Sequence, residues 1–198
     1  MSVRPGQDWG AEQDVPSDVP VVATDRDLAD AAADGHRLVA LDGGDMWRTL
    51  GGRGGVRSRL GTAAWVTPVD LATVTVDGVD LGLMAAHLIA HNRWWTGQAA
   101  AVMNAQWWGD RDMAPRSHPG DGRLDTLVGA LPARQLLQAR TRVRSGQHVP
   151  HPAITAARPK RFEHTFTSPR QIWVDGVRRG SGRSIVVEVV PGAVSVLV

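Results

Sequence analysis

The sequence of 198 residues contains no cysteine, no tyrosine and a single lysine, Lys160. Without cysteine the chain can form no disulfide, no thiolate nucleophile and no cysteine-ligated zinc site. No run of about 18 uncharged apolar residues occurs, and residues 1–17 lack the apolar segment of a secretory signal. We therefore expect a cytoplasmic protein.

Charge gives no indication of a nucleic-acid partner. The formal net charge is only +2, and the isoelectric point of about 10.2 reflects the shortage of groups that titrate above neutral pH. Arg140, Arg142 and Arg144 form a basic stretch, but no aromatic residues alternate with them. A solvated face is the simpler interpretation.

The hydrophobic pattern divides the chain into three parts. Residues 1–18 are rich in Pro, Gly and Asp and are expected to form a flexible arm. Residues 19–62 read as strand, helix and strand, a truncated α/β fragment. Residues 63–198 read as many short strands separated by turns such as Asp77-Gly78 and Asp175-Gly176, which favours a sandwich or barrel. The predicted fold class is mainly β (α+β).

Individual elements follow from the same pattern. One helix, 133–142, is expected among the later strands, after Pro132. The expected strands of the third part are 63–66, 70–76, 81–89, 97–105, 124–129, 164–167, 171–174, 184–190 and 194–198.

The segment 103–125 carries the most functional information. It reads as a strand, a polar loop containing His118-Pro119-Gly120-Asp121-Gly122, and a second strand. Such a loop offers carbonyl oxygens and one carboxylate to a hard cation such as magnesium or calcium. The same composition also makes an ordinary turn, which is the simpler interpretation from the residues alone.

A glycine loop and two histidine pairs are candidate ligand sites. Gly43-Gly44-Asp45 lies between a strand and a helical turn, as a phosphate loop would, but Asp42 and Asp45 would repel a phosphate, so a tight turn is favoured. His87 with His91, and His148 with His151, could each begin a zinc site. Neither pair has a nearby cysteine or a motif acid, and we assign no transition metal.

Two tryptophan doublets, Trp94-Trp95 and Trp107-Trp108, are unusual in a chain with two phenylalanines. Neighbouring residues on a strand point to opposite faces, so one indole of each doublet should face outward. An apolar cleft or a membrane surface would suit that indole.

Taken in order, several segments resemble the C-terminal half of the diacylglycerol-kinase-like family, the bacterial lipid kinases that share a fold with sphingosine and NAD kinases. The resemblance runs from about Leu38 to the C-terminus. It rests on Asp45–Gly51 (family Asn-Asp-Phe-x-Arg-Thr-Leu-Gly), Pro68–Leu71 (Pro-Val-Asp-Leu), Asn104 with Met113–Pro115 and Pro119–Asp125, then Gly146, His148, His151 and Pro152, and finally Asp175-Gly176.

The resemblance implies an antiparallel β-sandwich like the C-terminal domain of bacterial lipid kinases. It also implies that Asp175 is the general base, although Val177 stands where the family has a glutamate. A structural magnesium ion is the implied cofactor, held by the Asp121 side chain and the carbonyls of His118 and Arg123.

The implied nucleotide site departs from the family pattern. In the family, ATP is held mainly by an upstream α/β domain, for which this chain has no room, and Asp42 replaces a nucleotide-contacting threonine. ATP is therefore not an expected cofactor.

Three functions remain open at this point. The first is a non-catalytic, lipid-binding or regulatory module. The alternative is an active lipid kinase that phosphorylates a lipid hydroxyl with Asp175 as base and is completed by another chain or a second copy. The third is an interaction protein that uses its exposed tryptophans. The expected partners are a lipid or other apolar small molecule, a transient membrane-surface contact, and a partner chain or homo-oligomer, with no nucleic acid.

Overall fold

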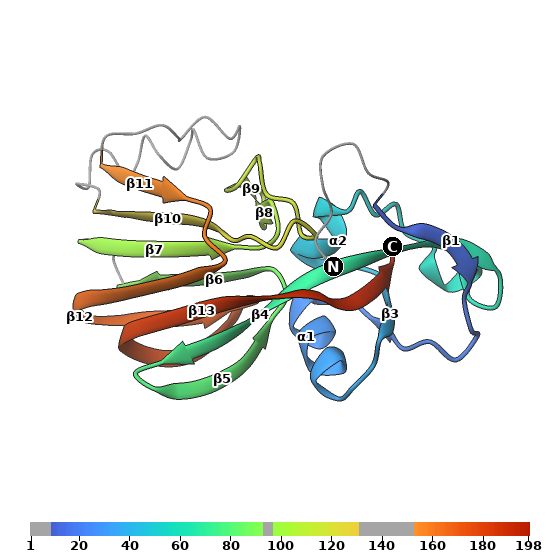
Figure 1. Cartoon of the computed structure of the whole chain (residues 1–198), viewed down its shortest axis with the longest axis horizontal. Helices are drawn as coiled ribbons and strands as arrows, with labels where there is room; N and C mark the ends of the chain where they lie inside the picture. Colours follow the sequence, from blue (N-terminus) through green and yellow to red (C-terminus); the bar gives the residue numbers. More distant parts are fainter. Residues whose placement is uncertain (1–8, 93–96, 131–152) are drawn as a thin grey trace.

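The computed structural model describes residues 9–92, 97–130 and 153–198. One mostly antiparallel sheet of eleven strands dominates the molecule, and two short α-helices, α1 and α2, pack near its N-terminal strands (Figure 1). This confirms the mainly β prediction. None of the described helices is both long and apolar enough to cross a membrane.

The main path of the sheet runs β1-β4-β13-β12-β6-β7-β10-β11, and β5 pairs with β4. β3 pairs in parallel with the end of β13, and β2 pairs in parallel with β3. A separate hairpin is formed by β8 and β9. The strands are β1 (Ala11–Asp14), β2 (Val21–Val22), β3 (Leu38–Leu41), β4 (Ala63–Val76), β5 (Val79–Met84), β6 (His87–His91), β7 (Gln98–Met103), β8 (Trp107–Trp108), β9 (Arg111–Asp112), β10 (Asp125–Ala130), β11 (Ile154–Ala157), β12 (Arg161–Val174) and β13 (Val177–Leu197); the helices are α1 (Asp25–Ala33), α2 (Gly44–Thr49) and the 3-10 helix η1 (Val56–Arg59).

The sheet curls around its largest core. Buried side chains of β4, β5, β6, β7, β12 and β13 meet in one cluster, and Phe166 is among the largest of them. Val74 and Val187 are inward-facing members from paired positions of β4 and β13. Alternation along parts of β12 and β13 gives these strands one buried face.

Three observed strands each join two expected ones, and one expected strand is divided. The expected strands 164–167 and 171–174 are one strand, β12, with a register shift between Thr165 and Arg170. The expected strands 63–66 and 70–76 are one strand, β4, which continues through Pro68. The expected strands 184–190 and 194–198 are likewise one strand, β13, with a register shift between Val190 and Val194. In contrast, the expected strand 81–89 breaks at Ala85-Ala86 into β5 and β6. The expected helix 133–142 lies outside the described residues.

The N-terminal elements extend the sheet. Thr24 accepts a hydrogen bond from the Asp27 amide and caps α1, and β3 then pairs with β13. Within the segment expected to be an arm, β1 pairs with β4, and the Trp9 indole donates to the Pro68 carbonyl at 2.8 Å. The division into three parts stays a prediction.

Candidate functional site

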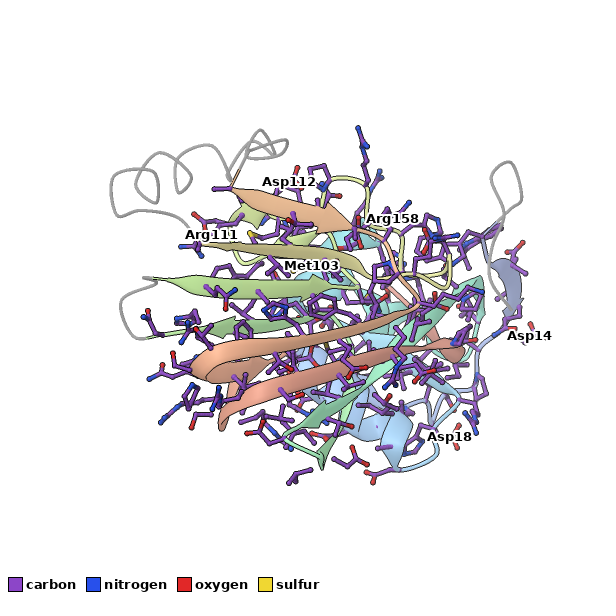
Figure 2. All side chains as sticks on the ribbon, turned by 60° about the vertical axis from the view of Figure 1, so that its left-hand side comes forward. Asp14, Asp18, Met103, Arg111, Asp112 and Arg158 are labelled. Carbon is purple, nitrogen blue, oxygen red and sulfur yellow. The ribbon has the colours of Figure 1, made fainter. Side chains whose placement is uncertain are left out.

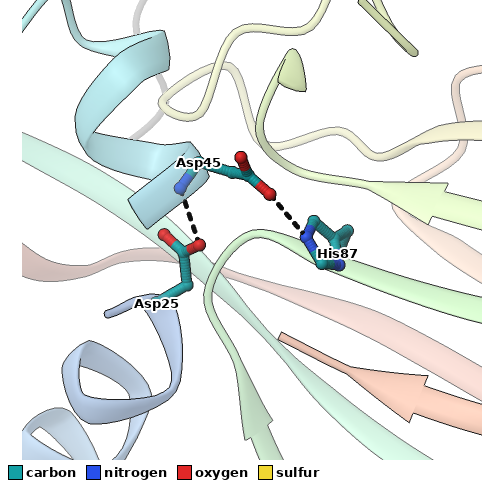
Figure 3. Close-up of side chains that lie close together, drawn as sticks. All are labelled: Asp25, Asp45 and His87. Carbon is teal, nitrogen blue, oxygen red and sulfur yellow. Dashed lines mark hydrogen bonds and ion pairs between the residues drawn. The ribbon is translucent and has the colours of Figure 1, made fainter. Parts of the chain in front are cut away.

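Three polar side chains meet where α1, α2 and β6 come together: Asp25, Asp45 and His87 (Figure 3). Asp25 and His87 are buried, with exposed fractions of 6% and 2%. One ligand atom from each residue lies within 4.8 Å of the others, so this group could hold a metal ion. It is the main polar feature that sequence reasoning missed.

Asp25 acts as a cap for α2. Its carboxylate oxygens accept the Asp45 amide at 2.7 Å and the Met46 amide at 2.8 Å, which are among the N–H groups that a helix start leaves without partners. Gly44 has a φ of +94°, and a Cβ there would lie 2.6 Å from Asp25 Oδ1. The glycine turn is therefore tight, and the anion that it receives is a carboxylate of the same chain.

Asp45 connects this group to the β8–β9 hairpin. Its Oδ2 lies 2.9 Å from His87 Nε2, and its Oδ1 accepts the Gly109 amide at 2.9 Å. The α2 helix, β6 and the hairpin are thus tied together through one carboxylate.

Burial, hydrogen bonds and nearby charges all act on the pKa values of Asp25 and His87. Burial raises the pKa of Asp25 to about 6, against the lowering effect of its two backbone hydrogen bonds. Burial alone would lower the pKa of His87, but its hydrogen bond to Asp45 and the negative charges of Asp175, Asp45 and Asp25 outweigh burial and raise it. The pKa values of both Asp25 and His87 are therefore raised, through different causes.

Asp175, the residue that the resemblance assigns as general base, lies in the turn between β12 and β13. It has a φ of +49° and an exposed fraction of 7%. Its carboxylate accepts three backbone N–H groups: Oδ2 accepts Ala85 at 2.9 Å, and Oδ1 accepts Ala86 at 2.8 Å and His87 at 3.1 Å. Burial raises its pKa, opposed by the nearby His87 and by these amides. The side chain joins the β12–β13 turn to the corner between β5 and β6.

Asp121, predicted as a metal ligand, contacts a cation of the chain. Its Oδ1 accepts the Arg123 amide at 3.0 Å, and its Oδ2 lies 2.6 Å from Arg158 Nη2. The His118 carbonyl accepts the amides of Gly120 at 2.8 Å and Asp121 at 3.2 Å. The loop is closed by its own hydrogen bonds.

The two predicted sites are separate but joined by one buried amide. Asn104 donates from Nδ2 to the carbonyls of Asp70 and Ala85, both at 2.7 Å. Asp70 accepts the Gly122 amide at 2.6 Å and so holds the Asp121 loop, while Ala85 belongs to the corner held by Asp175. The structure brings Asp175 close to His87 and leaves Asp121 with Arg158.

The remaining predicted features have different outcomes. Trp107 and Trp108 form β8 and are both half-buried. Arg48 lies over the Trp107 ring at 3.5 Å, and Arg111 lies over the Trp108 ring at 4.7 Å. The other doublet, Trp94-Trp95, and the pair His148 and His151 lie outside the described residues.

Comparison with known proteins identifies the fold. The sequence matches the family described as the YegS C-terminal NAD kinase beta sandwich-like domain over residues 60–198. The structure is similar to that of a protein from Bacillus anthracis str. Sterne assigned as a diacylglycerol kinase, with 13% sequence identity and a TM-score of 0.63 over 90% of this chain and 77% of that chain.

Two further structures from the same organism agree. One, also assigned as a diacylglycerol kinase, has 13% identity and a TM-score of 0.62 over 86% of this chain and 81% of that chain. The other, a diacylglycerol kinase by its description, has 12% identity and a TM-score of 0.55 over 86% and 78%. At these identities the similarity shows the fold alone. No curated protein matches the sequence.

Proposed function

This chain belongs to the family of the YegS C-terminal NAD kinase beta sandwich-like domain, and we propose that it acts as a non-catalytic, lipid-binding or regulatory module. The match confirms the resemblance seen in the motifs. The observation that carries the proposal is the state of the Asp175 carboxylate, which is buried against three backbone N–H groups.

A general base needs an oxygen that can reach the proton of its substrate hydroxyl, within about 2.6–3.2 Å or through one water. Both oxygens of Asp175 face amides of the β5–β6 corner, and only 7% of the residue is exposed. The carboxylate therefore serves to hold two turns together. A hydroxyl of a lipid could approach it only through the small part of the residue that is exposed.

The start of α2 is also unsuited to a nucleotide phosphate. The Asp25 carboxylate already accepts the amides of Asp45 and Met46, and Asp42 stands exposed just before the glycine turn. Two carboxylates at one turn repel a polyphosphate unless a cation separates them. This supports a module that does not use ATP.

The β8–β9 hairpin supports contact with a lipid surface. It presents two half-buried indoles, each with a guanidinium over its ring. Indoles favour the membrane–water interface, where one side of the ring is apolar and the other is wet. Guanidinium groups pair with lipid phosphates.

The test combines two titrations of the purified chain. We expect no change in tryptophan fluorescence with micromolar ATP and magnesium. We expect saturable co-sedimentation with phosphatidylglycerol vesicles and weaker co-sedimentation with phosphatidylcholine vesicles. Arg111→Gln should weaken the vesicle affinity about fivefold, since a surface arginine contributes about 1 kcal/mol near an anionic membrane. Arg57→Gln, an equal charge change in η1, is the matched control and should leave the affinity unchanged.

The outcomes separate the candidate functions. Micromolar ATP binding would overturn the non-catalytic proposal and favour the kinase completed by another chain or second copy. Absence of binding to either vesicle would overturn the lipid part and favour an interaction protein.

A further inference from the structure

A guanidinium lies between two carboxylates at the loop 118–125. Arg158 follows β11 (Figure 2). Its Nη2 lies 2.6 Å from Asp121 Oδ2, and its Nε lies 3.2 Å from Asp125 Oδ1. Both carboxylates are largely shielded, with exposed side-chain fractions of 20% and 15%.

The oxygens around this point are already used by the chain. Asp121 Oδ1 accepts the Arg123 amide, and the His118 carbonyl accepts two amides within the loop. The Arg123 side chain, in turn, donates to the Arg158 carbonyl at 3.0 Å. A magnesium ion requires near-octahedral oxygen ligands at about 2.0–2.1 Å and holds its water tightly. The residues present do not fit that ion, because a guanidinium stands against the one carboxylate that would bind it.

Asp70, the buried carboxylate that holds the loop, is also occupied by backbone amides. Asp70 is fully buried, and its two oxygens accept the amides of Gly122 at 2.6 Å and Gly192 at 2.7 Å. In these contacts both of its oxygens face backbone N–H groups, and neither faces a cation. Direct charge pairing of both Asp121 and Asp125 therefore comes from Arg158, while Arg116 acts on Asp125 at longer range.

We propose that Arg158 is the resident cation of this loop, in the place that the resemblance gives to magnesium, and that the chain does not bind magnesium there. Arg158→Ala would remove the guanidinium from the loop. Asp121 and Asp125 would then lose their directly paired cation, which leaves a two-carboxylate site for a divalent cation. Calcium should bind more tightly than magnesium, because it tolerates irregular oxygen coordination.

The test is thermal unfolding of metal-free protein, with magnesium chloride or calcium chloride compared against sodium chloride of equal ionic strength. The parent chain should show no metal-specific shift of Tm. Arg158→Ala should unfold at a lower temperature without metal and regain about 2–4 °C on saturation with calcium. Adding Asp121→Asn to that variant should abolish the response.

Two further variants serve as controls. Arg161→Ala removes an exposed arginine paired with Glu188 at 2.8 Å, so it is the matched control for lost charge and should not respond to metal. Arg158→Lys keeps a positive charge at the loop and should stay insensitive to metal even if Arg158→Ala does not fold.

Three results would overturn the proposal. The first is saturable stabilisation of the parent chain by magnesium that Asp121→Asn removes. The second is a folded Arg158→Ala protein that ignores both metals. The third is a metal response in Arg158→Lys equal to that of Arg158→Ala. No lipid or nucleotide enters this assay, so its result is independent of the proposed function.

Discussion

Replacing Asp175 tests whether its carboxylate is a structural anchor or a free base. Asp175→Ala would leave the buried amides of Ala85, Ala86 and His87 without their acceptor. A hydrogen bond to a charged group contributes about 1.5–3 kcal/mol, and a buried unsatisfied donor costs about 1–3 kcal/mol. Release of the buried charge offsets part of this loss, since burial raises the pKa of Asp175. We expect a loss of about 3–5 kcal/mol in the free energy of unfolding.

Asp175→Asn should cost less. Asparagine tolerates the left-handed φ of +49°, and its oxygen can still accept the Ala86 and His87 amides. Its NH₂ group would face the Ala85 amide, donor against donor. We expect a loss of about 1–3 kcal/mol.

Asp77 is the matched control, because it occupies the other Asp-Gly turn with the same φ of +49°. It also accepts backbone amides, those of Arg183 at 3.0 Å and Ser184 at 2.7 Å, but it is exposed. Water can replace its carboxylate, so Asp77→Ala should cost about 1–2 kcal/mol. Any penalty of alanine at positive φ is common to both alanine variants and cancels in the comparison.

The assay is urea unfolding followed by tryptophan fluorescence. Equal losses for Asp175→Ala and Asp77→Ala would refute the anchor argument. So would an Asp175→Asn protein that is as stable as the parent but has lost a lipid-phosphorylating activity, because that pattern belongs to a catalytic base.

Three further predictions concern the buried polar group. The pKa of Asp25 is about 6 in the folded chain against 3.8 ordinarily, so folding favours its protonated form. The free energy of unfolding of the parent, measured with urea, should therefore fall by up to about 3 kcal/mol relative to that of Asp25→Asn as the pH rises from about 4 to about 7. The raised pKa of His87 stabilises the fold below its ordinary pKa and ceases to do so as the pH rises through the folded value; His87→Gln should therefore be more destabilising at about pH 6 than at about pH 9. Gly44→Ala should lower Tm several degrees more than Gly78→Ala, since both glycines have positive φ but only at Gly44 would a Cβ meet a neighbour, 2.6 Å from Asp25 Oδ1.

Local pattern predicted most of the longer strands, because apolar residues recur in them either alternately, as in β13, or consecutively, as in β6. It failed where a long-range contact decides the outcome. The break at Ala85-Ala86 has no glycine or proline to mark it, and the amides freed there are taken by Asp175, about ninety residues further along the chain. Conversely, β4 continues through Pro68, which lies between the expected strands 63–66 and 70–76, and the Pro68 carbonyl accepts the Trp9 indole.

The candidate site was likewise only partly predictable from the sequence. Motif order was enough to select Asp121 and Asp175 from the sequence. Their partners could not be selected, because Arg158 lies 37 residues from Asp121 and belongs to no motif. Asp25 and His87 are brought together only by the packing of α1 against the sheet, so no spacing in the sequence indicates them.

Asp121 and Asp175, the two acids that the motifs select, are both held by groups of the same chain. Asp175 is balanced by three amides and Asp121 by a guanidinium and an amide, and in each case the partner comes from the same chain. A carboxylate held in this way has less free energy to gain from a substrate proton or a metal, because its charge is already compensated by groups of the same chain. Retention of a motif therefore does not establish retention of its chemistry. Within this fold, the residue at the position of Arg158 should decide whether the loop responds to a divalent cation, and chains that carry the loop without an arginine there should be the metal-dependent ones.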